Sequence, residues 1–134
     1  MSTPVQLIAS KDLFVVNGEE TIELANARMK AAQTRHLPVT DEAGNIVGIL
    51  SDRDVLRVMR TVKSGRVQDY MSWPVETISE TQTIGDAAKK MVESKISSLI
   101  VLRDGSAVGI VTSEDLLKTL IRDHESLLDR FKEG

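Results

Sequence analysis

The chain has no cysteine, only two histidines, and few aromatic residues. Without cysteine it can form no disulfide, no thiolate nucleophile and no cysteine-ligated zinc site. Two histidines are too few for a histidine-rich metal site, so we expect no metal ligands. The aromatic content of 3% also leaves few surfaces on which single-stranded nucleic acid could stack.

The chain also lacks an excess of basic residues, because its formal net charge is −3. Duplex-binding domains carry a basic surplus, so we do not expect nucleic acid as a partner. No apolar run approaches the ~20 residues that a membrane-spanning helix needs, and no charged-then-apolar leader opens the sequence. We therefore expect no membrane partner and a cytoplasmic location.

What the sequence does have is the composition of a globular protein, with 41% hydrophobic and 28% charged residues over 134 positions. Such a length fits one ordinary domain or two small domains that share a core.

An internal repeat organises the chain. At an offset of 62 residues, Thr21-Ile22 aligns with Thr83-Ile84, and Met29 aligns with Met91. After one gap the offset becomes 61, and Val47-Gly48-Ile49 aligns with Val108-Gly109-Ile110. The register predicts three parts: a first unit at 5–62, a second unit at 67–124, and a C-terminal helical extension at 125–134.

Each unit is predicted to run strand, helix, strand, strand, helix, which is an α+β fold. The apolar spacing predicts the following strands: 13–16, 37–40 and 46–50 in the first unit, and 75–78, 99–102 and 107–111 in the second. Closing helices begin near Asp52 and Ser113, and Asp104-Gly105 suits a type I′ turn. A unit of about 60 residues is marginal alone, so we expect the two to pack as one pseudo-symmetric module.

The closing helices carry predicted apolar faces. The first is lined by Val55, Met59 and Val62, and the second by Leu116, Leu117, Leu120 and Ile121. The second face continues to about Phe131 and includes His124, which we interpret as a packed or interfacial side chain.

One motif occurs twice, with the pattern glycine, two apolar residues, serine or threonine, two variable residues, and aspartate. It runs from Gly48 to Asp54 and from Gly109 to Asp115. Glycine inside a strand is typical of a place where another group approaches the backbone closely. A serine or threonine at a strand-to-helix junction lies at a helix N-terminus, which favours phosphate, but the same spacing also fits a helix capping box. Both interpretations stay open, and they are compatible.

The stretches "RHLPVTDEAGNIVGILSDRDVL" (35–56) and "SSLIVLRDGSAVGIVTSEDLL" (97–117) resemble the second half of a cystathionine-β-synthase (CBS) domain. The segment "VQDYMSWPVETIS" (67–79) is similar to the lead-in of a second such unit. The resemblance covers nearly the whole chain. It implies a pair of CBS domains with two clefts between the copies, which bind AMP, ADP, ATP, S-adenosylmethionine or NAD, and it implies a homodimer.

The resemblance also implies ligand-binding residues. Asp54 and Asp115 would accept hydrogen bonds from ribose hydroxyls, and Ser51 and Thr112 would donate to phosphate. Adenine would contact a set of residues on the strands, namely Val15, His36, Leu37 and Pro38 in the first copy and Thr77, Ser98, Leu99 and Ile100 in the second. Arg35 and Arg53 add cations near the first cleft, so we expect ligands or affinities to differ between clefts.

The leading functional prediction is a regulatory module without enzymatic activity. It would bind an adenosine nucleotide as a regulatory ligand and would require no cofactor. It would signal to a separate effector protein. The alternative is a ligand-free interaction or dimerisation module. No nucleophile triad or phosphate-binding loop of the Gly-x-x-x-x-Gly-Lys type is present to indicate an enzyme.

Overall fold

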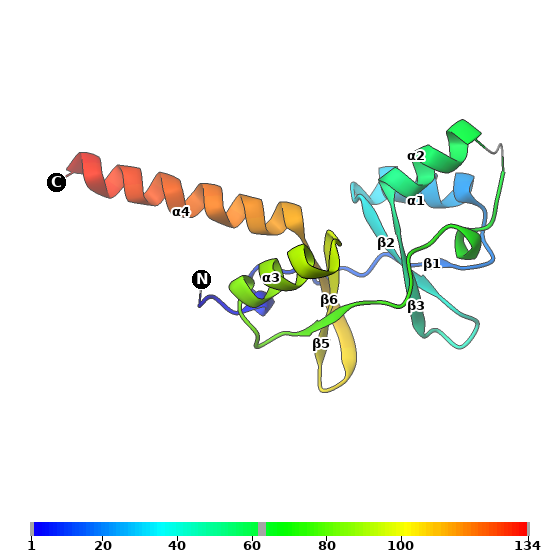
Figure 1. The fold of residues 1–134 in the computed structure, drawn as a ribbon, viewed down its shortest axis with the longest axis horizontal. Coiled ribbons are helices and arrows are strands. Elements are labelled where there is room, and N and C mark those ends of the chain that lie inside the picture. The colour runs from blue at the N-terminus through cyan, green and yellow to red at the C-terminus, as the bar shows by residue number, and fades with distance from the viewer. Residues whose placement is uncertain (1, 62–63, 134) are drawn as a thin grey trace. The chain divides into compact units, whose positions relative to one another are not determined.

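The computed structural model describes residues 2–61 and 64–133 of the chain, without side-chain placement at 131–133. The chain forms two compact units (Figure 1). The first unit consists of residues 13–76, and the second unit consists of residues 1–12 together with 77–134. No helix among the described residues is long and apolar enough to cross a bilayer.

The two units repeat one order of elements. The first unit contains β1 (Val16–Asn17), α1 (Ile22–Ala32), β2 (His36–Thr40), β3 (Ile46–Ser51), α2 (Asp52–Thr61) and the 3-10 helix η2 (Val67–Asp69). The second unit contains η1 (Val5–Leu7), β4 (Thr77–Ser79), α3 (Ile84–Ser94), β5 (Ser98–Arg103), β6 (Ser106–Thr112) and α4 (Ser113–Glu133). In each sheet a short parallel strand pairs with the first arm of an antiparallel hairpin. The predicted α+β order is confirmed in both units.

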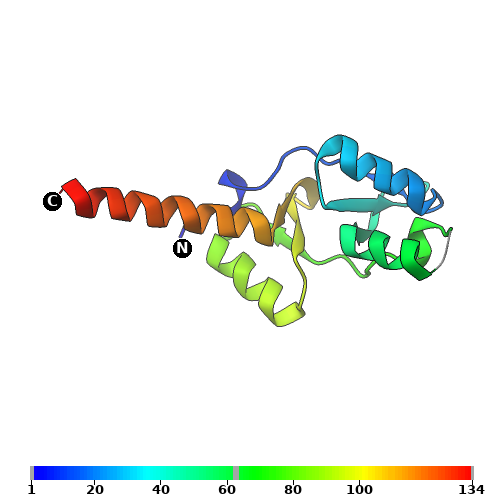
Figure 2. The same cartoon turned by 90° about the horizontal axis from the view of Figure 1, so that it is seen from above.

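The first helix of each repeat forms over apolar residues that are three and four positions apart in the sequence, namely Ile22, Ala25 and Met29 in the first copy and Ile84, Ala87 and Met91 in the second. Ile22, Ala25 and Met29 share one face of α1 and are buried, because residues three and four apart lie on the same side of a helix. The Thr21 hydroxyl accepts the Leu24 N–H and caps the N-terminus. In Figure 2, α1 lies beside α2 in the first unit and α3 lies beside α4 in the second.

Several boundaries differ from the sequence predictions. The short strands begin later than expected, at Val16 and Thr77. In α2, Val55 and Val58 are buried whereas Met59 is exposed, so the predicted lining by Met59 is wrong. Val62 lies outside the described residues. The turn at Asp104-Gly105 is confirmed, because both residues have the positive φ that a type I′ turn requires.

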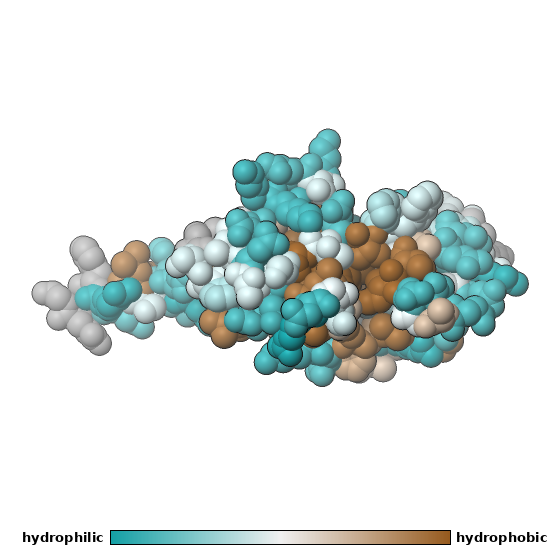
Figure 3. Space-filling view, turned by 90° about the horizontal axis from the view of Figure 1, so that it is seen from below, coloured by the Kyte–Doolittle hydropathy of each residue, from teal (hydrophilic) through white to brown (hydrophobic). Residues whose placement is uncertain are grey.

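The apolar face predicted for α4 is covered only at its start. Leu116 packs against the core of the second unit. The apolar residues that follow it are exposed, so their predicted packing against the core is wrong, namely Leu117, Leu120 and Ile121. His124 is exposed as well. Figure 3 shows apolar atoms at the surface among the polar ones along the arm that α4 forms. The side chain of Phe131, also predicted on this face, lies outside the described residues.

The two units exchange their N-terminal segments. Residues 2–12 contain the start of the first repeat but pack with the second unit, while residues 64–76 contain the start of the second repeat but pack with the first unit. We call these two stretches the lead-in segments. Val5 and Val67 occupy equivalent places in them, and each is completely buried in the core that its lead-in joins. The compact units therefore divide the chain differently from the sequence repeats.

Val5→Ala should lower the free energy of unfolding by roughly 2 kcal/mol, because it removes two methyl groups from a packed core. Gln6→Ala is the matched control, since Gln6 is exposed on the same turn and such surface changes usually stay within about 0.5 kcal/mol. Urea unfolding of both variants measures the difference. Equal stabilities would contradict the placement of Val5 in the core.

Candidate functional site

The first copy of the motif joins β3 to α2. Ser51 ends the strand, and its backbone N–H donates to Oδ2 of Asp54 at 2.9 Å. In return, the Asp54 N–H donates to the Ser51 hydroxyl oxygen at 3.2 Å. The Arg57 guanidinium contacts the other carboxylate oxygen, Oδ1, at 3.1 Å. Both oxygens of Asp54 are therefore engaged within the first unit.

The second copy joins β6 to α4 in the same way. The Thr112 N–H and hydroxyl both donate to Oδ2 of Asp115, at 2.8 and 3.0 Å. The Asp115 N–H donates back to the Thr112 hydroxyl oxygen at 3.3 Å. Among the described residues, no hydrogen bond or ion pair reaches the second oxygen of Asp115. This carboxylate therefore keeps one acceptor oxygen available.

Both motif copies thus have the geometry of a reciprocal helix cap. The same geometry occurs at a third place, where Thr83 and Asp86 cap α3 without belonging to the motif. The capping interpretation is therefore confirmed for the Ser/Thr and Asp pairs. It leaves ligand binding open, because a cap and a ligand contact can coexist on one carboxylate.

Contacts within each unit explain why the motif has glycine, because the lead-in segment passes close to the backbone at that position. A Cβ added at Gly109 would lie 2.5 Å from the carbonyl oxygen of Ser10, which belongs to the lead-in segment. Ser10 and Ile110 exchange two backbone hydrogen bonds at this crossing, both of 2.9 Å. At Gly48 an added Cβ would meet the Met71 side chain and, at 3.0 Å, the carbonyl oxygen of Ser72. The close approach that the glycines predict is made by the chain's own backbone.

The structure places the predicted ligand residues of each copy in one unit. In the first unit, His36 pairs with Ser51 across the hairpin, and Arg35 and Arg53 are exposed beside them. In the second unit, Ser98 pairs with Thr112. Thr77 pairs with Ile100 in the parallel strand, whereas Val15 lies directly before β1.

The predicted adenine contacts lie on two different faces of each sheet. Leu37 and Leu99 are fully buried members of the two cores, so only their backbone atoms remain for a ligand. Pro38 and Ile100 follow them and point to the opposite face, because side chains alternate along a strand. Ile100 pairs with Ile110 there, and neither belongs to the second unit's core cluster.

Sequence reasoning missed a pair of cations that hold the short strands. The Arg28 guanidinium donates to the Val15 carbonyl oxygen at 3.0 Å. The Lys90 ammonium donates to the Thr77 carbonyl oxygen in the other unit. Arg28 and Lys90 occupy equivalent positions in the repeat, and this was the signal that could have revealed them. They fix the backbone at two of the predicted adenine contacts.

Each unit also has a surface cavity. In the first unit, a cavity of about 580 Å³ is lined by Leu13, Phe14, Val15, Arg28, Ala31 and Ala32. It includes the predicted contact Val15 and the cation that holds it. It is mainly apolar, with one charged side chain at its wall.

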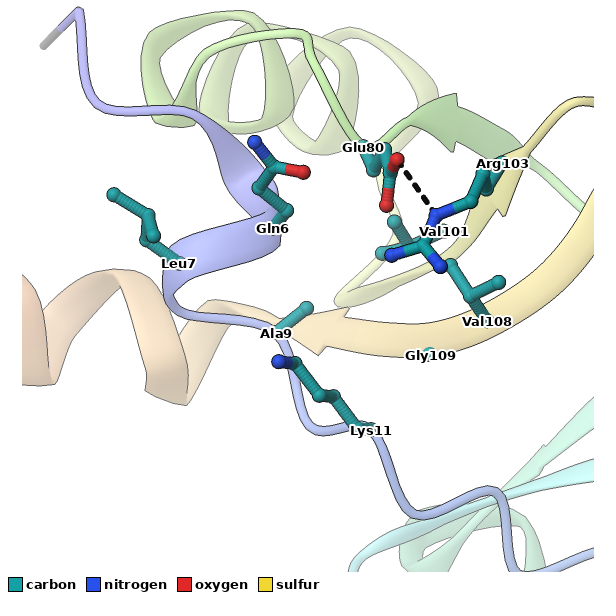
Figure 4. A pocket seen from close by; sticks show the side chains of 9 residues that line it. All are labelled: Gln6, Leu7, Ala9, Lys11, Glu80, Val101, Arg103, Val108 and Gly109. Carbon is teal, nitrogen blue, oxygen red and sulfur yellow. Dashed lines mark hydrogen bonds and ion pairs between the residues drawn. The ribbon is translucent and has the colours of Figure 1, made fainter.

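The second unit's cavity was not predicted. It has a volume of about 380 Å³ and lies between η1 and the β5–β6 hairpin. Figure 4 shows Arg103 and Glu80 joined at its wall and Lys11 at its edge. The Arg103 Nε donates to Glu80 at 2.8 Å. No group of three acidic or histidine side chains able to hold a metal ion occurs among the residues that the structure describes.

Comparison with known proteins identifies the family. The profile of the CBS domain matches the chain twice, over residues 5–61 and 67–122. The chain belongs to the CBS-domain family. A CBS domain-containing protein of Dictyostelium discoideum is 30% identical over 136 residues, covering 91% of this chain and 94% of that protein.

Two further relatives place the CBS pair in wider contexts. The CBS domain pair of protein MJ0100, solved in complex with 5′-methylthioadenosine and S-adenosyl-L-methionine, is 30% identical with a TM-score of 0.83. That match covers 92% of this chain and 99% of the MJ0100 chain. An L-aspartate semialdehyde sulfurtransferase of Methanocaldococcus jannaschii is 32% identical over 120 residues, but the match covers only 23% of its length.

Alanine at the two motif glycines should have unequal effects. Gly109→Ala should lower the free energy of unfolding by more than about 2 kcal/mol, because the new Cβ meets a backbone oxygen in a hydrogen-bonded crossing. Gly48→Ala should cost less, since much of its clash is with the flexible Met71 side chain. Urea unfolding of the ligand-free protein measures both. If both variants kept full stability, the glycines would serve something other than the lead-in contact.

The Glu80–Arg103 ion pair should be visible in a titration. The Arg103 hydrogen bond holds the pKa of Glu80 below its usual range, and attraction to Lys11 adds to the effect. The pair's stabilisation is complete above the ordinary glutamate pKa and is lost as pH falls through the lowered value. Side-chain ¹³C NMR should show the pKa of Glu80 rising in Arg103→Gln. Asp41, whose pKa is lowered by hydrogen bonds from Asn45, should titrate unchanged as the internal control.

Proposed function

We propose that this CBS pair is a regulatory module that binds an adenosine-containing ligand and has no catalytic activity of its own. The observation that carries the proposal is the similarity to the MJ0100 CBS pair, which extends over nearly the full length of both chains. The MJ0100 pair was solved in complex with 5′-methylthioadenosine and S-adenosyl-L-methionine. The twofold occurrence of the Ser/Thr-x-x-Asp motif at strand-to-helix junctions supports it.

The motif geometry favours the second copy as the stronger ribose site. Ribose hydroxyls need an acceptor, and a carboxylate offers two oxygens. Asp115 has one oxygen without a described partner, whereas the second oxygen of Asp54 is held by Arg57. The Arg57 side chain is 67% exposed, and such surface ion pairs contribute little, so a ligand could displace it. We therefore propose unequal affinities, with Asp115 making the larger contribution.

The phosphate or sulfonium end of the ligand would meet different surroundings in the two copies. The Thr112 hydroxyl already donates to Asp115, whereas the described bonds of the Ser51 hydroxyl use it as an acceptor. Arg53 and Arg35 are exposed near Ser51, and arginine binds phosphate bidentately. The first copy is thus better suited to a phosphorylated ligand, and the second to an uncharged or cationic one.

A binding ligand can regulate only through a difference in its affinity for two arrangements of the protein. We propose that ligand occupancy is communicated to a separate effector protein, with the chain acting in the cytoplasm as a homodimer. The alternative, a ligand-free interaction module, is favoured by the third cap at Thr83 and Asp86, which shows that this geometry occurs without the motif.

Thermal unfolding with AMP, ATP, S-adenosylmethionine, 5′-methylthioadenosine and NAD tests the proposal. A ligand at 100 times its dissociation constant should add about 2.7 kcal/mol, which is a shift of several degrees for a domain of this size. With S-adenosylmethionine or 5′-methylthioadenosine, Asp115→Ala should abolish most of the shift, and Asp54→Ala should reduce it less.

Asp86→Ala is the matched control for this experiment, because it removes an equivalent capping aspartate outside the motif. It should lower the unfolding temperature of the free protein while leaving the ligand-induced shift intact. No shift with any of the five compounds would favour the ligand-free module. Equal loss of the shift in all three variants would show that capping alone explains the motif.

A further inference from the structure

The cavity of the second unit lies where a methionine side chain lies in the first unit. At an offset of 62 residues, Ala9 of one lead-in segment aligns with Met71 of the other. Met71 packs against the core of its unit, and its sulfur lies beside Gly48. Ala9 has no atoms beyond Cβ to extend over Gly109, and both of these residues line the cavity. The short side chain therefore leaves open the space that Met71 occupies in the other unit.

The two lead-in segments follow the same backbone path past this space. The Gln6 N–H donates to the carbonyl oxygen of Glu80 at 3.0 Å. The Gln68 N–H donates to the equivalent oxygen of Gly18 at 2.8 Å. The hydrogen-bonded crossings beside the two motif glycines match as well. The cavity therefore results from the side chain at position 9 and not from a different course of the chain.

The charged residues at the wall are also particular to the second unit. Three charged side chains line the cavity, namely Lys11, Glu80 and Arg103. The residues that align with them in the first unit are, in the same order, Trp73, Gly18 and Asp41. By contrast, other lining residues align with identical residues of the first unit, namely Gln6, Val101, Val108 and Gly109. Both units thus share one scaffold, on which the second unit carries two cations beside an open space.

Both cations keep donors for a ligand. The Arg103 Nε donates to Glu80 at 2.8 Å, and a guanidinium has further N–H donors on its two terminal nitrogens. Among the described residues, no hydrogen bond or ion pair engages those terminal nitrogens or the Lys11 ammonium. Figure 4 shows Arg103 and Lys11 on different sides of the space above Ala9. Two cations and one carboxylate leave a positive surplus, which favours an anion.

The size and the apolar part of the wall narrow the class of ligand. A volume of about 380 Å³ is near the lower end of the range for small-molecule sites, which is about 300–1,000 Å³. Leu7, Ala9, Val101 and Val108 give the wall an apolar side. No residue among the described lining set is aromatic, so a nucleobase would find no ring to stack on. These features fit a small anion with an aliphatic chain.

We propose that this cavity binds a small aliphatic carboxylate. The carboxylate accepts hydrogen bonds from the terminal nitrogens of Arg103 and from the Lys11 ammonium, and such charge-assisted bonds are the strong ones. The chain lies over Ala9 and Gly109, in the space that Met71 occupies in the other unit. A butyl chain has about the length of a methionine side chain, so pentanoate is a simple member of this class.

This site is separate from the proposed adenosine sites. It includes Gly109, but it includes none of the residues proposed to contact the adenosine ligand. A carboxylate held by both cations joins the lead-in segment, which carries Lys11, to β5, which ends at Arg103. Occupancy should therefore hold the lead-in segment more firmly on its unit, whatever the adenosine sites contain.

NMR titration of the full chain with pentanoate, at constant ionic strength and without nucleotide, tests the proposal. The amide signals of Ala9 and Gly109 should shift in a saturable way, with a dissociation constant of about 1 mM or tighter, while the signals of Thr112 and Asp115 stay in place. Pentylamine has the same chain and the opposite charge, so it should not bind. Inorganic phosphate has charge without a chain, so it should bind at least about tenfold more weakly.

Two variants of the second unit test the space and the charge separately. Ala9→Met should abolish pentanoate binding without lowering the unfolding temperature, because it places in this cavity the side chain that occupies the first unit. Ala9→Val, a smaller filling, should weaken binding in part. Arg103→Gln should weaken binding about tenfold or more, since hydrogen bonds to a charged group are lost. Arg122→Gln is the matched control, because Arg122 lies on α4 outside the cavity, and it should leave the dissociation constant unchanged.

The reverse change in the first unit shows whether open space alone is sufficient. Met71→Ala should open the equivalent space, but it should create no pentanoate site, because Trp73 and Asp41 stand where the second unit has its cations. A pentanoate site created by Met71→Ala, undiminished binding in Ala9→Met or Arg103→Gln, or equal binding of pentylamine would each overturn the proposal. The same holds for a wild type whose Ala9 and Gly109 signals show no saturable shift.

Discussion

The crossing of each lead-in segment over a motif glycine is the contact on which the rest of the structure depends. At Gly109 the backbone of Ser10 approaches so closely that no side chain fits between them. That approach lets Ser10 and Ile110 exchange backbone hydrogen bonds, as Ser72 and Ile49 do in the other unit. It also carries Val5 and Val67 into cores that their own repeats do not form. A larger residue at the glycine would displace the lead-in and leave a buried position empty.

This constraint changes how the repeated motif is interpreted. Its glycine accommodates the lead-in, its serine or threonine caps a helix, and its aspartate completes the cap. A bound ligand must therefore contact atoms of the motif that these structural roles leave without a partner. The uncommitted oxygen of Asp115 is such an atom, whereas Asp54 would first have to release Arg57. The two motif copies look equivalent in sequence, but they differ in the carboxylate oxygens that a ligand can contact.

The order of elements could be predicted from sequence because local spacing determines it. Ile22, Ala25 and Met29 mark a helix by their periodicity, and Asp104-Gly105 marks a turn by its backbone preference. The exchange of lead-in segments could not be predicted, because Val5 and Val67 look alike and either core would accept either valine. The exposed side chains of α4 were misassigned for a related reason. Helical periodicity identifies an apolar face but does not say which surface covers it.

The exchanged lead-ins have a consequence for how such a chain can be built. A single repeat would need the lead-in segment of another repeat to complete its core. Two separate repeats would therefore exchange lead-in segments as a swapped dimer, which would dissociate on dilution. Joining the two repeats in one chain makes both exchanges intramolecular, and the effective concentration of each lead-in no longer depends on how much protein is present. The covalent link between the repeats therefore stabilises both cores.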